Sequence, residues 1–475
     1  DGVNYLSCIN GRPIPQYSKD NFDTSGNLYI KITMSTDDAS RFLPRLSFFC
    51  ITFYSNKDIY ADNYGDKITS ITDYYLGSLN YPILSRHAMN GIRPRHLSGF
   101  DLNASFEVTD TTRIRAAVPT LKHILNQGGS IVLMSHLGRP KNGPEEKYSL
   151  RHLIPVLENE LGVNVEFAGD CISETAFAKT SHLNSGQVVL LENLRFYKEE
   201  EKGQLEFSQL LCRHGDIYIN DAFGTAHRSH ASTAVMAQFY KDTCKAMGFL
   251  MQREVEQITK VMHHAQAPFT AIIGGAKVSD KILVIQQLLS RAQHIIIGGG
   301  MAFTFIKALK GSIGASICED DRIETALELL KQAKEKGVQL HLPTDAIAAD
   351  RFDANAQTKT VSVNAIPDAW MGLDIGPDSI REFSEVIENS KTILWNGPMG
   401  VFEMKPFEQG TRSIAQAVVK ATQHSAFSLI GGGDSVAAIN KYQMTNVVSY
   451  VSTGGGALLE FIEQGTLPGV KAILE

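Results

Sequence analysis

Short apolar runs rich in β-branched residues alternate with longer amphipathic stretches from about residue 108 to the end of the chain. Continuous apolar runs are typical of strands buried on both faces of a parallel sheet, and amphipathic stretches are typical of the helices that cover it. In Thr111–Asn126, Ile114, Val118 and Leu121 recur at helical spacing. The pattern predicts an α/β fold with strands at Ser130–Ser135, Asn164–Phe167, Gln187–Leu191, Asp216–Ile219, Phe269–Ile273, His294–Ile297, Gln339–Leu342, Thr392–Trp395, Phe427–Ile430 and Val447–Val451.

A long helical stretch at Phe249–His264 separates two regions with different motifs. Basic residues follow the apolar runs before it, and glycine clusters follow the apolar runs after it. A chain of 475 residues with 43% hydrophobic side chains can hold two or three packed domains. We therefore expect the domain boundary at this helix.

Residues 1–95 differ in composition from the rest of the chain. They contain nine of the 15 tyrosines and no glutamate, and the first glutamate is Glu107. Their short apolar runs show no sustained helical period, so the sequence predicts no fold for them. Three interpretations remain open: a lineage-specific extension, a divergent replacement of a first strand, or translation of a wrong frame or of non-coding sequence. The loss of glutamate favours the last.

Charge and cysteine usage exclude several classes of protein. With 45 Lys and Arg against 51 Asp and Glu, the net charge of −6 gives no overall attraction to nucleic acid or anionic membranes. The apolar stretch Leu46–Tyr54 is too short for a membrane span, and no signal-peptide pattern follows Asp1. Six scattered cysteines without a C-x-x-C pair favour reduced thiols. We expect a soluble cytoplasmic protein.

Basic residues lie just beyond the ends of three predicted strands before the boundary. His136 and Arg139 follow the first, Arg195 follows the third, and His227 and Arg228 follow the fourth. Ligands of an open parallel sheet bind at the carboxyl ends of its strands, so these cations are expected to meet at one multiply charged anion. Loop cations are often merely solvated, but the repetition at three strand ends favours a binding site.

Arg113 supplies an independent argument. It lies in the first turn of the helix that Asp110 and the following threonines open, where the helix dipole disfavours a cation. A cation in that position favours an anionic partner. The alternative is a side chain that reaches back to Asp110 or out to solvent.

Four glycine clusters follow apolar runs beyond the boundary, namely Gly274-Gly275-Ala276, Gly298-Gly299-Gly300, Gly431-Gly432-Gly433 and Gly454-Gly455-Gly456. Glycine allows the backbone to approach a phosphate, and a following helix directs its positive end to the same place. One such cluster can be a simple tight turn, but four indicate phosphate sites. Lys277 and Lys281 can neutralise a phosphate, and Asp434 can hold Mg²⁺.

Two common nucleotide-binding classes do not fit. No G-x-x-x-x-G-K-[ST] motif occurs, which excludes a P-loop NTPase, and no G-x-G-x-x-G motif opens a strand-to-helix turn, which disfavours a dinucleotide dehydrogenase. A basic pocket on one domain and a nucleotide-phosphate site on another are typical of a two-lobed phosphotransferase.

Several segments resemble, in the right order, the signature motifs of the phosphoglycerate kinase family. The resemblance runs from about Val108 to the C-terminus. The segments are Ser135-His136-Leu137-Gly138-Arg139-Pro140, Glu192-Asn193-Leu194-Arg195-Phe196, Asn220-Asp221-Ala222-Phe223-Gly224-Thr225-Ala226-His227-Arg228, Gly274-Gly275-Ala276-Lys277-Val278, Trp395-Asn396-Gly397-Pro398 and Gly431-Gly432-Gly433-Asp434.

The resemblance implies reversible transfer of the acyl phosphate of 1,3-bisphosphoglycerate to ADP, which gives 3-phosphoglycerate and ATP with Mg²⁺. It implies two Rossmann-like lobes with parallel sheets joined by a hinge helix, in a monomer without nucleic-acid or membrane partners. The implied phosphoglycerate-binding residues are Asp101, Asn103, Arg113, His136, Arg139, Arg195 and Arg228. The implied catalytic residues are Arg113, Lys277, Gly432 and Gly455. The implied nucleotide-binding residues are Gly274, Ala276, Lys277, Lys281, Gly299, Asn396, Pro398, Glu403, Gly431, Gly432, Gly433, Asp434 and Ser435, with Asp434 also the metal ligand.

The resemblance also implies domain limits. These are a phosphoglycerate-binding lobe at 96–250, a nucleotide-binding lobe at 251–462 and a C-terminal segment at 463–475 that returns to the first lobe. Residues 1–95 form an atypical segment of unknown fold. If that segment is foreign sequence, the sheet of the first lobe is expected to lack a strand.

The chain departs from the family pattern at the start of the first lobe. The family has a strand ending Arg-Val-Asp-Phe-Asn-Val-Pro, whose Asp and Asn bind the glycerate. Asp101 and Asn103 preserve that spacing, whereas an ungapped alignment places Leu97 and Gly99 there instead. The alternative function is therefore a catalytically impaired nucleotide-binding protein with a damaged glycerate lobe.

Overall fold

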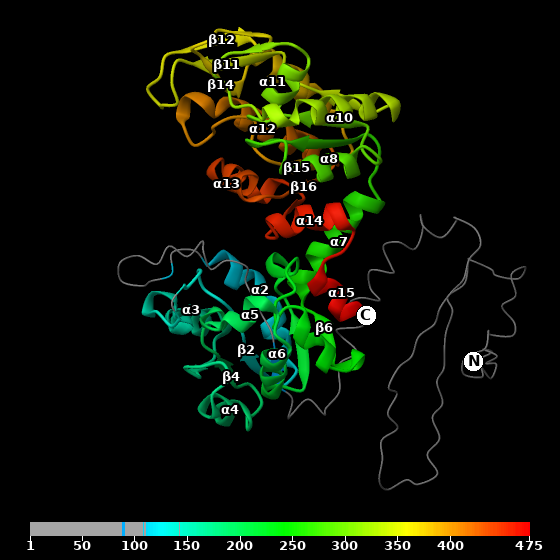
Figure 1. Ribbon diagram of the computed structural model, residues 1–475. Helices are drawn as coiled ribbons and strands as arrows, with labels where there is room; N and C mark the ends of the chain where they lie inside the picture. The colour runs from blue at the N-terminus through cyan, green and yellow to red at the C-terminus, as the bar shows by residue number, and fades with distance from the viewer. Residues whose placement is uncertain (1–87, 91–107, 109–110, 142) are drawn as a thin grey trace, which may run out of the picture. The chain divides into compact units, whose positions relative to one another are not determined.

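The computed structural model describes residues 88–90, 108, 111–141 and 143–475 (Figure 1). The chain divides into two units, Asp1–Leu79 and Asn80–Glu475, and every described residue belongs to the second unit. Two six-stranded parallel sheets with packed helices form this second unit, which confirms the predicted two-lobed α/β fold. Most of residues 1–95 lie outside the described residues.

The first sheet has the strand order β3-β4-β2-β1-β5-β6, with every neighbouring pair parallel. All positions of β2, β4 and β5 are buried, which explains their continuous apolar runs. The strands are β1 (Ala88–Asn90), β2 (Ser130–Leu133), β3 (Val165–Phe167), β4 (Val188–Leu190), β5 (Ile217–Asn220) and β6 (Lys245–Met247).

Strand β1 corrects one expectation from the sequence. Ala88–Asn90 pairs in parallel with β2 on one side and with β5 on the other, so the first sheet does not lack a strand at this place. A strand of three residues is too short to show an alternating or continuous apolar pattern. Its pairing with two neighbours defines it, and pairing is a tertiary property that local sequence does not contain.

The second sheet has the strand order β10-β8-β7-β15-β16-β17 and is also parallel throughout. The predicted limits of β7, β8 and β16 match the observed ones. Strand β17 begins at Tyr450, three residues later than predicted, and Val447 belongs to a 3₁₀ turn. The strands are β7 (Phe269–Ile273), β8 (His294–Ile297), β10 (Gln339–His341), β15 (Thr392–Asn396), β16 (Phe427–Ile430) and β17 (Tyr450–Val451).

Both sheets are covered on both faces. In β7, Ala271 and Ile273 belong to one core, whereas Ile272 belongs to another. The same alternation occurs in β2 between Val132 and its neighbour Ile131. Figure 1 labels many of the helices. The described helices are α2 (Thr112–Asn126), α3 (Ile154–Leu161), α4 (Glu174–Thr180), α5 (Lys198–Lys202), α6 (Leu205–Leu211), α7 (Phe249–His263), α8 (Ile282–Leu288), α9 (Ala302–Ala308), α10 (Ile323–Glu335), α11 (Pro377–Glu388), α12 (Gln409–Gln423), α13 (Gly433–Lys441), α14 (Gly456–Gln464) and α15 (Pro468–Leu474).

Several short strands escaped the sequence analysis. Strand β11 (Asp345–Ala349) pairs antiparallel with β12 (Thr358–Ser362) and β14 (Met371–Ile375), and β9 (Ser312–Ile313) pairs with β13 (Ala365–Ile366). Positions in β12 alternate between exposed and half-buried, so its apolar signal is weak. Such strands depend on their partners rather than on their own composition.

Asp221 fastens the start of α7 to the first sheet. This buried side chain follows β5 and accepts hydrogen bonds from the Thr120 hydroxyl at 2.6 Å and from the Met251 N–H at 2.9 Å. Thr120, in α2, in turn accepts the Phe249 N–H at 2.9 Å. Burial raises the pKa of Asp221 to about 6, against the effect of these donors. The carboxyl group thereby joins β5, α2 and α7.

Glu254 fastens the same helix to a loop of the second sheet. Its buried carboxylate accepts hydrogen bonds from the Ser452 hydroxyl at 2.7 Å and from the Thr453 N–H at 2.6 Å, just beyond β17. Burial raises the pKa of Glu254 above its ordinary value. Helix α7 is therefore linked to both sheets by hydrogen-bonded acidic groups.

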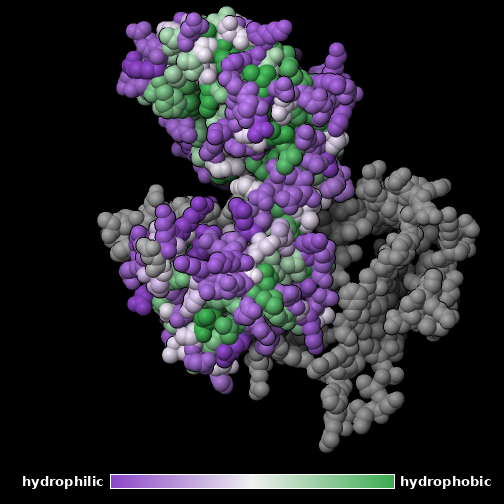
Figure 2. Space-filling view, in the orientation of Figure 1, coloured by the Kyte–Doolittle hydropathy of each residue, from purple (hydrophilic) through white to green (hydrophobic). Residues whose placement is uncertain are grey.

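The structure describes part of the surface, the helices and four of the six cysteines. Hydrophilic residues cover most of the face shown in Figure 2. None of the helices in the described part of the chain has the length and apolar character needed to cross a bilayer. Among the described residues, Cys171, Cys212, Cys244 and Cys318 are free thiols.

We expect protonation of His214 to weaken the fold. Its ring nitrogens lie 2.8 Å from the Thr180 hydroxyl and 2.8 Å from the Cys171 carbonyl oxygen, and burial lowers its pKa from the ordinary value of 6.5. A base with a lowered pKa stabilises the fold fully above its unfolded pKa and loses that contribution as pH falls through the folded pKa. Between the unfolded pKa and the lower folded pKa, the free energy of unfolding should fall by up to about 1.4 kcal/mol per pH unit for this group, and it should not fall further below the folded pKa.

Urea unfolding between pH 5 and pH 7.5 measures this loss. The variant His214→Gln keeps a hydrogen-bond donor and an acceptor but does not titrate, so its free energy of unfolding should depend less on pH than that of the wild type. Equal pH dependence in the two proteins would show that His214 does not control acid stability.

Candidate functional site

The basic residues predicted from the sequence gather at the carboxyl ends of β2, β4 and β5. His136 and Arg139 follow β2, Arg195 lies in the turn Leu194–Phe196 after β4, and Arg228 follows β5. Because the strands are parallel and belong to one sheet, these loops share one edge. The structure therefore brings the predicted basic loops to the same side of the first sheet.

Hydrogen bonds fasten the loop after β2 to the loop after β4. The buried Asn193 amide donates to the Leu137 carbonyl at 2.7 Å, and Arg195 Nη1 donates to the Gly138 carbonyl at 2.9 Å. Arg195 Nε also lies 3.1 Å from the Glu201 carboxylate, and only 8% of the Arg195 side chain is exposed. The orientation of this guanidinium is thus set by groups on two loops and a helix.

The other basic residues of the edge differ in exposure. His136 is fully buried, whereas Arg139 and Arg228 are exposed, and among the described residues neither arginine has a side-chain hydrogen bond or ion pair. Arg113 lies in the first turn of α2, which contains no acidic residue and whose N-cap residue Thr111 makes no capping hydrogen bond with its side chain. A helix N-terminus attracts an anion, and no side chain of this first turn supplies one, so the N-terminus of α2 suits an anionic ligand.

Two predicted residues cannot be placed. Asp101 and Asn103, which the sequence analysis assigned to the glycerate, lie outside the described residues. Their assignment stays a prediction.

The second sheet has its switch point between β7 and β15, where the strand order reverses and where α/β sheets bind ligands. The turns that follow these two strands touch. A Cβ on Gly274 would lie 2.1 Å from the Pro398 carbonyl oxygen, and the Gly275 N–H donates to that oxygen at 3.3 Å. A Cβ on Gly299, after β8, would lie 2.6 Å from the Gly275 nitrogen. Glycine is required here because three backbone turns meet.

Lys281 and Asn396 link these turns to the third glycine cluster. Lys281 Nζ donates to Asn396 Oδ1, and Asn396 Nδ2 donates to the Gly431 carbonyl at 2.8 Å. Burial lowers the pKa of Lys281, while the charges of Asp280 and Asp434 act in the opposite direction. A phosphate beside this ammonium would favour its charged form, and by linkage the charged form would favour the phosphate.

The third glycine cluster opens α13. Gly432 has a φ of +93°, and a Cβ there would lie 2.5 Å from Asn396 Nδ2. The buried Ser435 hydroxyl accepts the Gly397 N–H at 2.5 Å, which joins the start of α13 to the turn after β15. Asp434 is exposed in the first turn of α13. The helix N-terminus is thus held beside Lys281 and Asn396.

The fourth glycine cluster opens α14 and contacts the other sheet's loops. Gly455, with a φ of +55°, is the N-cap residue of α14. A Cβ on Gly454 would lie 2.3 Å from the ring of Phe223, which belongs to the 3₁₀ turn Phe223–Thr225 after β5. The glycine turn before α14 therefore packs against the loop after β5, which leads to Arg228.

Three predicted residues stay apart from this hydrogen-bonded group. Ala276 and Lys277 are exposed after β7, and Glu403 is exposed in the loop after β15. The structure shows no hydrogen bond between these side chains and the other predicted site residues it describes. Their predicted roles require a bound ligand.

The sequence analysis missed the acidic side chains that hold the basic loops. Glu201 pairs with Arg195, and Glu200 is buried against the loop that follows Arg228. The only signal was a run of three glutamates four residues after Arg195, which is also typical of a solvated helix.

The described residues fit a metal ion only as part of a ligand complex. They contain no cluster of three or more His, Cys, Asp or Glu side chains that could hold a metal. Mg²⁺ commonly binds one or two carboxylates together with substrate phosphates. Asp434 fits this pattern because its exposed carboxylate lies in the first turn of α13, near enough to Lys281 to influence its pKa.

Comparison with known proteins gives consistent results. A family model described as phosphoglycerate kinase matches residues 96–465. The phosphoglycerate kinase of Porphyromonas gingivalis is 51% identical over 395 residues, which cover 78% of this chain and 94% of that protein. The cytosolic enzyme of Nicotiana tabacum is 49% identical over 372 residues, covering 78% and 92%, and the chloroplastic enzyme of Chlamydomonas reinhardtii is 50% identical over 372 residues, covering 78% and 80%.

A solved structure supports the same relationship. The phosphoglycerate kinase structure from Coxiella burnetii matches with a TM-score of 0.75 and 37% sequence identity, and covers 82% of this chain and 97% of that chain. The similarity therefore extends over nearly the whole length of that relative.

Two neighbouring glycines allow a matched test of the third cluster. We expect Gly432→Ala to lower the free energy of unfolding by about 1–3 kcal/mol, because its φ of +93° suits only glycine and the Cβ would press on Asn396. Gly433→Ala should change it by less than about 0.5 kcal/mol, because no atom lies within 4 Å of a Cβ there. Urea unfolding measures both. Equal destabilisation by the two substitutions would show that the turn does not depend on Gly432.

Proposed function

The chain belongs to the phosphoglycerate kinase family, and we propose that its two strand-end clusters are the two substrate sites of this enzyme. The reaction is the reversible transfer of a phosphoryl group from 1,3-bisphosphoglycerate to ADP, which gives 3-phosphoglycerate and ATP. One observation supports this assignment of sites. The same chain has a basic edge on its first sheet and, on its second sheet, a switch point lined by glycines and a lysine.

The basic edge is proposed to bind phosphoglycerate. A carboxylate and a phosphate on one small molecule need several fixed cations, and the loops after β2, β4 and β5 supply them. Arg195 is held by Gly138 and Glu201, whereas Arg139 and Arg228 are exposed to a ligand. The proposed residues are Arg113, His136, Arg139, Arg195 and Arg228, with Asp101 and Asn103 completing the set.

The switch point of the second sheet is proposed to bind the nucleotide. Lys281 lies where Gly274, Asn396 and Gly431 meet and would neutralise a phosphate. Lys277 would serve the transferring phosphoryl group, and Glu403 would contact the nucleoside. The backbone contacts are proposed at Gly274, Ala276, Gly299, Pro398, Gly431, Gly432, Gly433 and Ser435.

Asp434 is proposed to hold Mg²⁺ in the metal–nucleotide complex. The metal, when bound, neutralises charge on the nucleotide phosphates. The chain itself contributes the carboxylate of Asp434 and the N-termini of α13 and α14, which direct partial positive charge at phosphate oxygens.

The chemistry requires positioning more than covalent help. The attacking oxygen of ADP is already ionised, so no general base is needed. Arg113 and Lys277 would neutralise the charge on the phosphoryl group in transfer, and the backbone N–H groups at Gly432 and Gly455 would do the same from the helix N-termini. Because water competes with ADP as acceptor, we propose that closure about α7 excludes water from the assembled site.

An impaired nucleotide-binding protein is the weaker alternative. The relatives of similar sequence are named as kinases, and the basic residues His136, Arg139, Arg195 and Arg228 are present. A coupled assay of ATP formation, run beside calorimetry of ADP binding, separates the two functions. ADP binding without ATP formation would establish the alternative. We further propose that the enzyme is a cytoplasmic monomer, which sedimentation and localisation of the native protein would test.

We expect Arg113→Ala to lower kcat by about 10³-fold, the scale of an arginine that neutralises charge in phosphoryl transfer. The matched control is Arg115→Ala, because Arg115 lies on the same helix but pairs with Glu160 at its exposed surface. Steady-state kinetics should show near-normal turnover for the control only. Near-normal turnover of Arg113→Ala would remove its proposed role.

We expect Asp434→Ala to raise the KM for Mg–ATP at least tenfold with little change in the KM for 3-phosphoglycerate, because a lost metal ligand affects only the metal–nucleotide complex. Asp378→Ala is the control, since Asp378 occupies the first turn of α11 and pairs with Arg381. Kinetics at varied Mg²⁺ give both constants. A parallel loss for the two substrates would indicate a general structural defect.

A further inference from the structure

The loop Arg228–Thr233 is held on one side by strand β5. The Tyr218 hydroxyl shares its hydrogen between the Ser232 and Thr233 carbonyl oxygens, each at 3.0 Å. The Asn220 amide donates to the Thr233 carbonyl at 2.8 Å. Tyr218 and Asn220 are both buried. These bonds fix the far end of the loop, whereas exposed Arg228 stands at its beginning.

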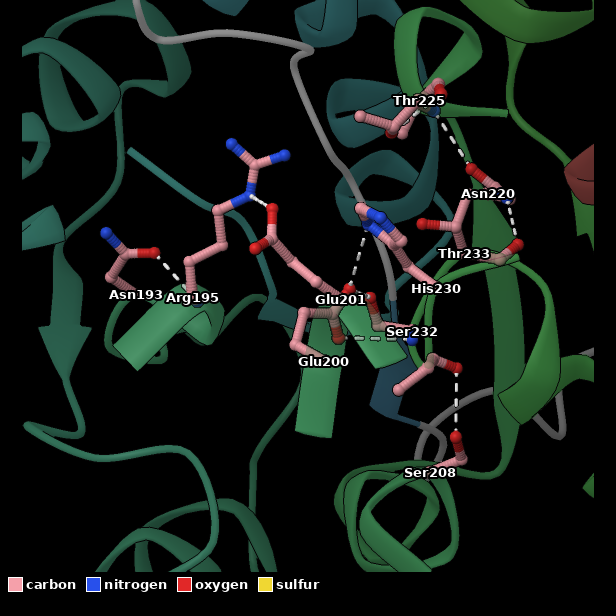
Figure 3. Close-up of polar contacts among 12 residues, drawn as sticks. Asn193, Arg195, Glu200, Glu201, Ser208, Asn220, Thr225, His230, Ser232 and Thr233 are labelled. Atoms are coloured by element: carbon pink, nitrogen blue, oxygen red, sulfur yellow. Dashed lines mark hydrogen bonds and ion pairs between the residues drawn. The ribbon is translucent and has the colours of Figure 1, made fainter. Parts of the chain in front are cut away.

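The short helix α5 holds the same loop from the other side. The Glu200 carbonyl accepts the Ala231 N–H at 2.9 Å. The Glu200 carboxylate accepts the Ser232 hydroxyl at 3.0 Å and the Ser232 N–H at 3.3 Å (Figure 3). A Cβ on Gly203, the C-cap of α5, would lie 2.4 Å from the Ser229 carbonyl oxygen. The helix thus touches the loop at Ser229, Ala231 and Ser232.

Glu200 is wholly buried, with a side-chain exposure of 0%, and its carboxylate also lies 3.8 Å from His230 Nδ1. A buried carboxylate is costly unless donors surround it, so the loop conformation that supplies these donors is favoured over others. The donors to the carboxylate come from Ser232, within this loop.

The next residue of α5 contacts the second basic loop. Glu201 pairs with Arg195 at 3.1 Å, and Figure 3 shows Glu200 and Glu201 side by side on α5, with Arg195 beside Glu201 and Ser232 beside Glu200. Helix α5 follows directly on the turn that contains Arg195. Two consecutive carboxylates of α5 therefore contact the two basic loops: Glu200 contacts the loop of Arg228, and Glu201 contacts Arg195 itself.

We propose that Glu200 is a positioning residue for phosphoglycerate binding, which sets the loop of Arg228 relative to Arg195 through α5. This inference rests on the proposed function, in which both arginines bind phosphoglycerate. Glu200 does not touch the substrate. It holds the backbone from which Arg228 extends, so its loss affects the glycerate site and spares the nucleotide site on the second sheet.

Glu200→Gln tests the proposal by steady-state kinetics in the direction that consumes 3-phosphoglycerate and ATP. The amide keeps the volume but loses the charge and one acceptor oxygen. We expect the KM for 3-phosphoglycerate to rise at least fivefold and the KM for ATP to stay within twofold. Glu199→Gln is the matched control, because it removes the same charge one residue earlier on α5, and both KM values should stay within twofold.

Three outcomes would overturn the proposal. The first is an unchanged KM for 3-phosphoglycerate in Glu200→Gln. The second is a parallel rise in both KM values, which would indicate general loosening of the structure. The third is an equal effect of Glu199→Gln, which would indicate that only the lost charge matters. If Glu200→Gln does not fold, Ser232→Ala removes only the hydroxyl partner. The same selective rise in KM is then expected, and its absence would overturn the proposal.

Arg228→Ala separates this inference from the proposed function. If Arg228→Ala leaves the KM for 3-phosphoglycerate unchanged, the assignment of Arg228 to the substrate is wrong. If Arg228→Ala raises that KM but Glu200→Gln does not, the substrate assignment holds and the positioning role of Glu200 is wrong. Wild-type turnover in the same assay establishes the kinase activity on which both depend.

Discussion

The buried carboxyl groups of Asp221 and Glu254, beside and within α7, need hydrogen-bond donors, and this need constrains the rest of the described structure. A carboxylate out of water is costly unless donors surround it. The donors to Asp221 come from α2 and from the start of α7, and those to Glu254 come from the loop after β17. Segments far apart in the sequence must therefore be in place together. The helix that carries Arg113 and the loop that leads to Gly455 are both connected to α7 in this way.

The same principle governs the two candidate sites on a smaller scale. Residues that define the geometry are buried and fastened between loops, as Asn193 is between the loops of β2 and β4, and as Asn396 is between Lys281 and Gly431. Some residues that would meet a ligand, such as Arg228 and Glu403, are exposed, whereas His136 and most of the Arg195 side chain are buried. Preorganised charge is what phosphoryl transfer requires, because donors already in place need no reorganisation in the transition state.

Sequence patterns predicted which loops meet at the two candidate sites, because the residue types in these loops are chemically unusual in their places. Basic residues after apolar runs and glycine clusters before helices are signals that a structural role alone explains poorly. The supporting acidic residues were not predictable in this way. Asp221, Glu200 and Glu254 look like ordinary polar residues of a loop or a helix, and their burial results from packing between segments 30 to 199 residues apart in the chain.

The sequence by itself determined the α/β class, the limits of β7, β8 and β16 and the presence of a long helix at α7, and it predicted the loops that carry the candidate site residues. Apolar periodicity and backbone requirements are local properties, so the sequence contains them. Only the tertiary structure decided that Ala88–Asn90 pairs inside the first sheet and that β11, β12 and β14 form a sheet of their own. It also decided which carboxylates hold the basic loops. Strand pairing and the burial of charge depend on distant partners, and no window of the sequence contains them.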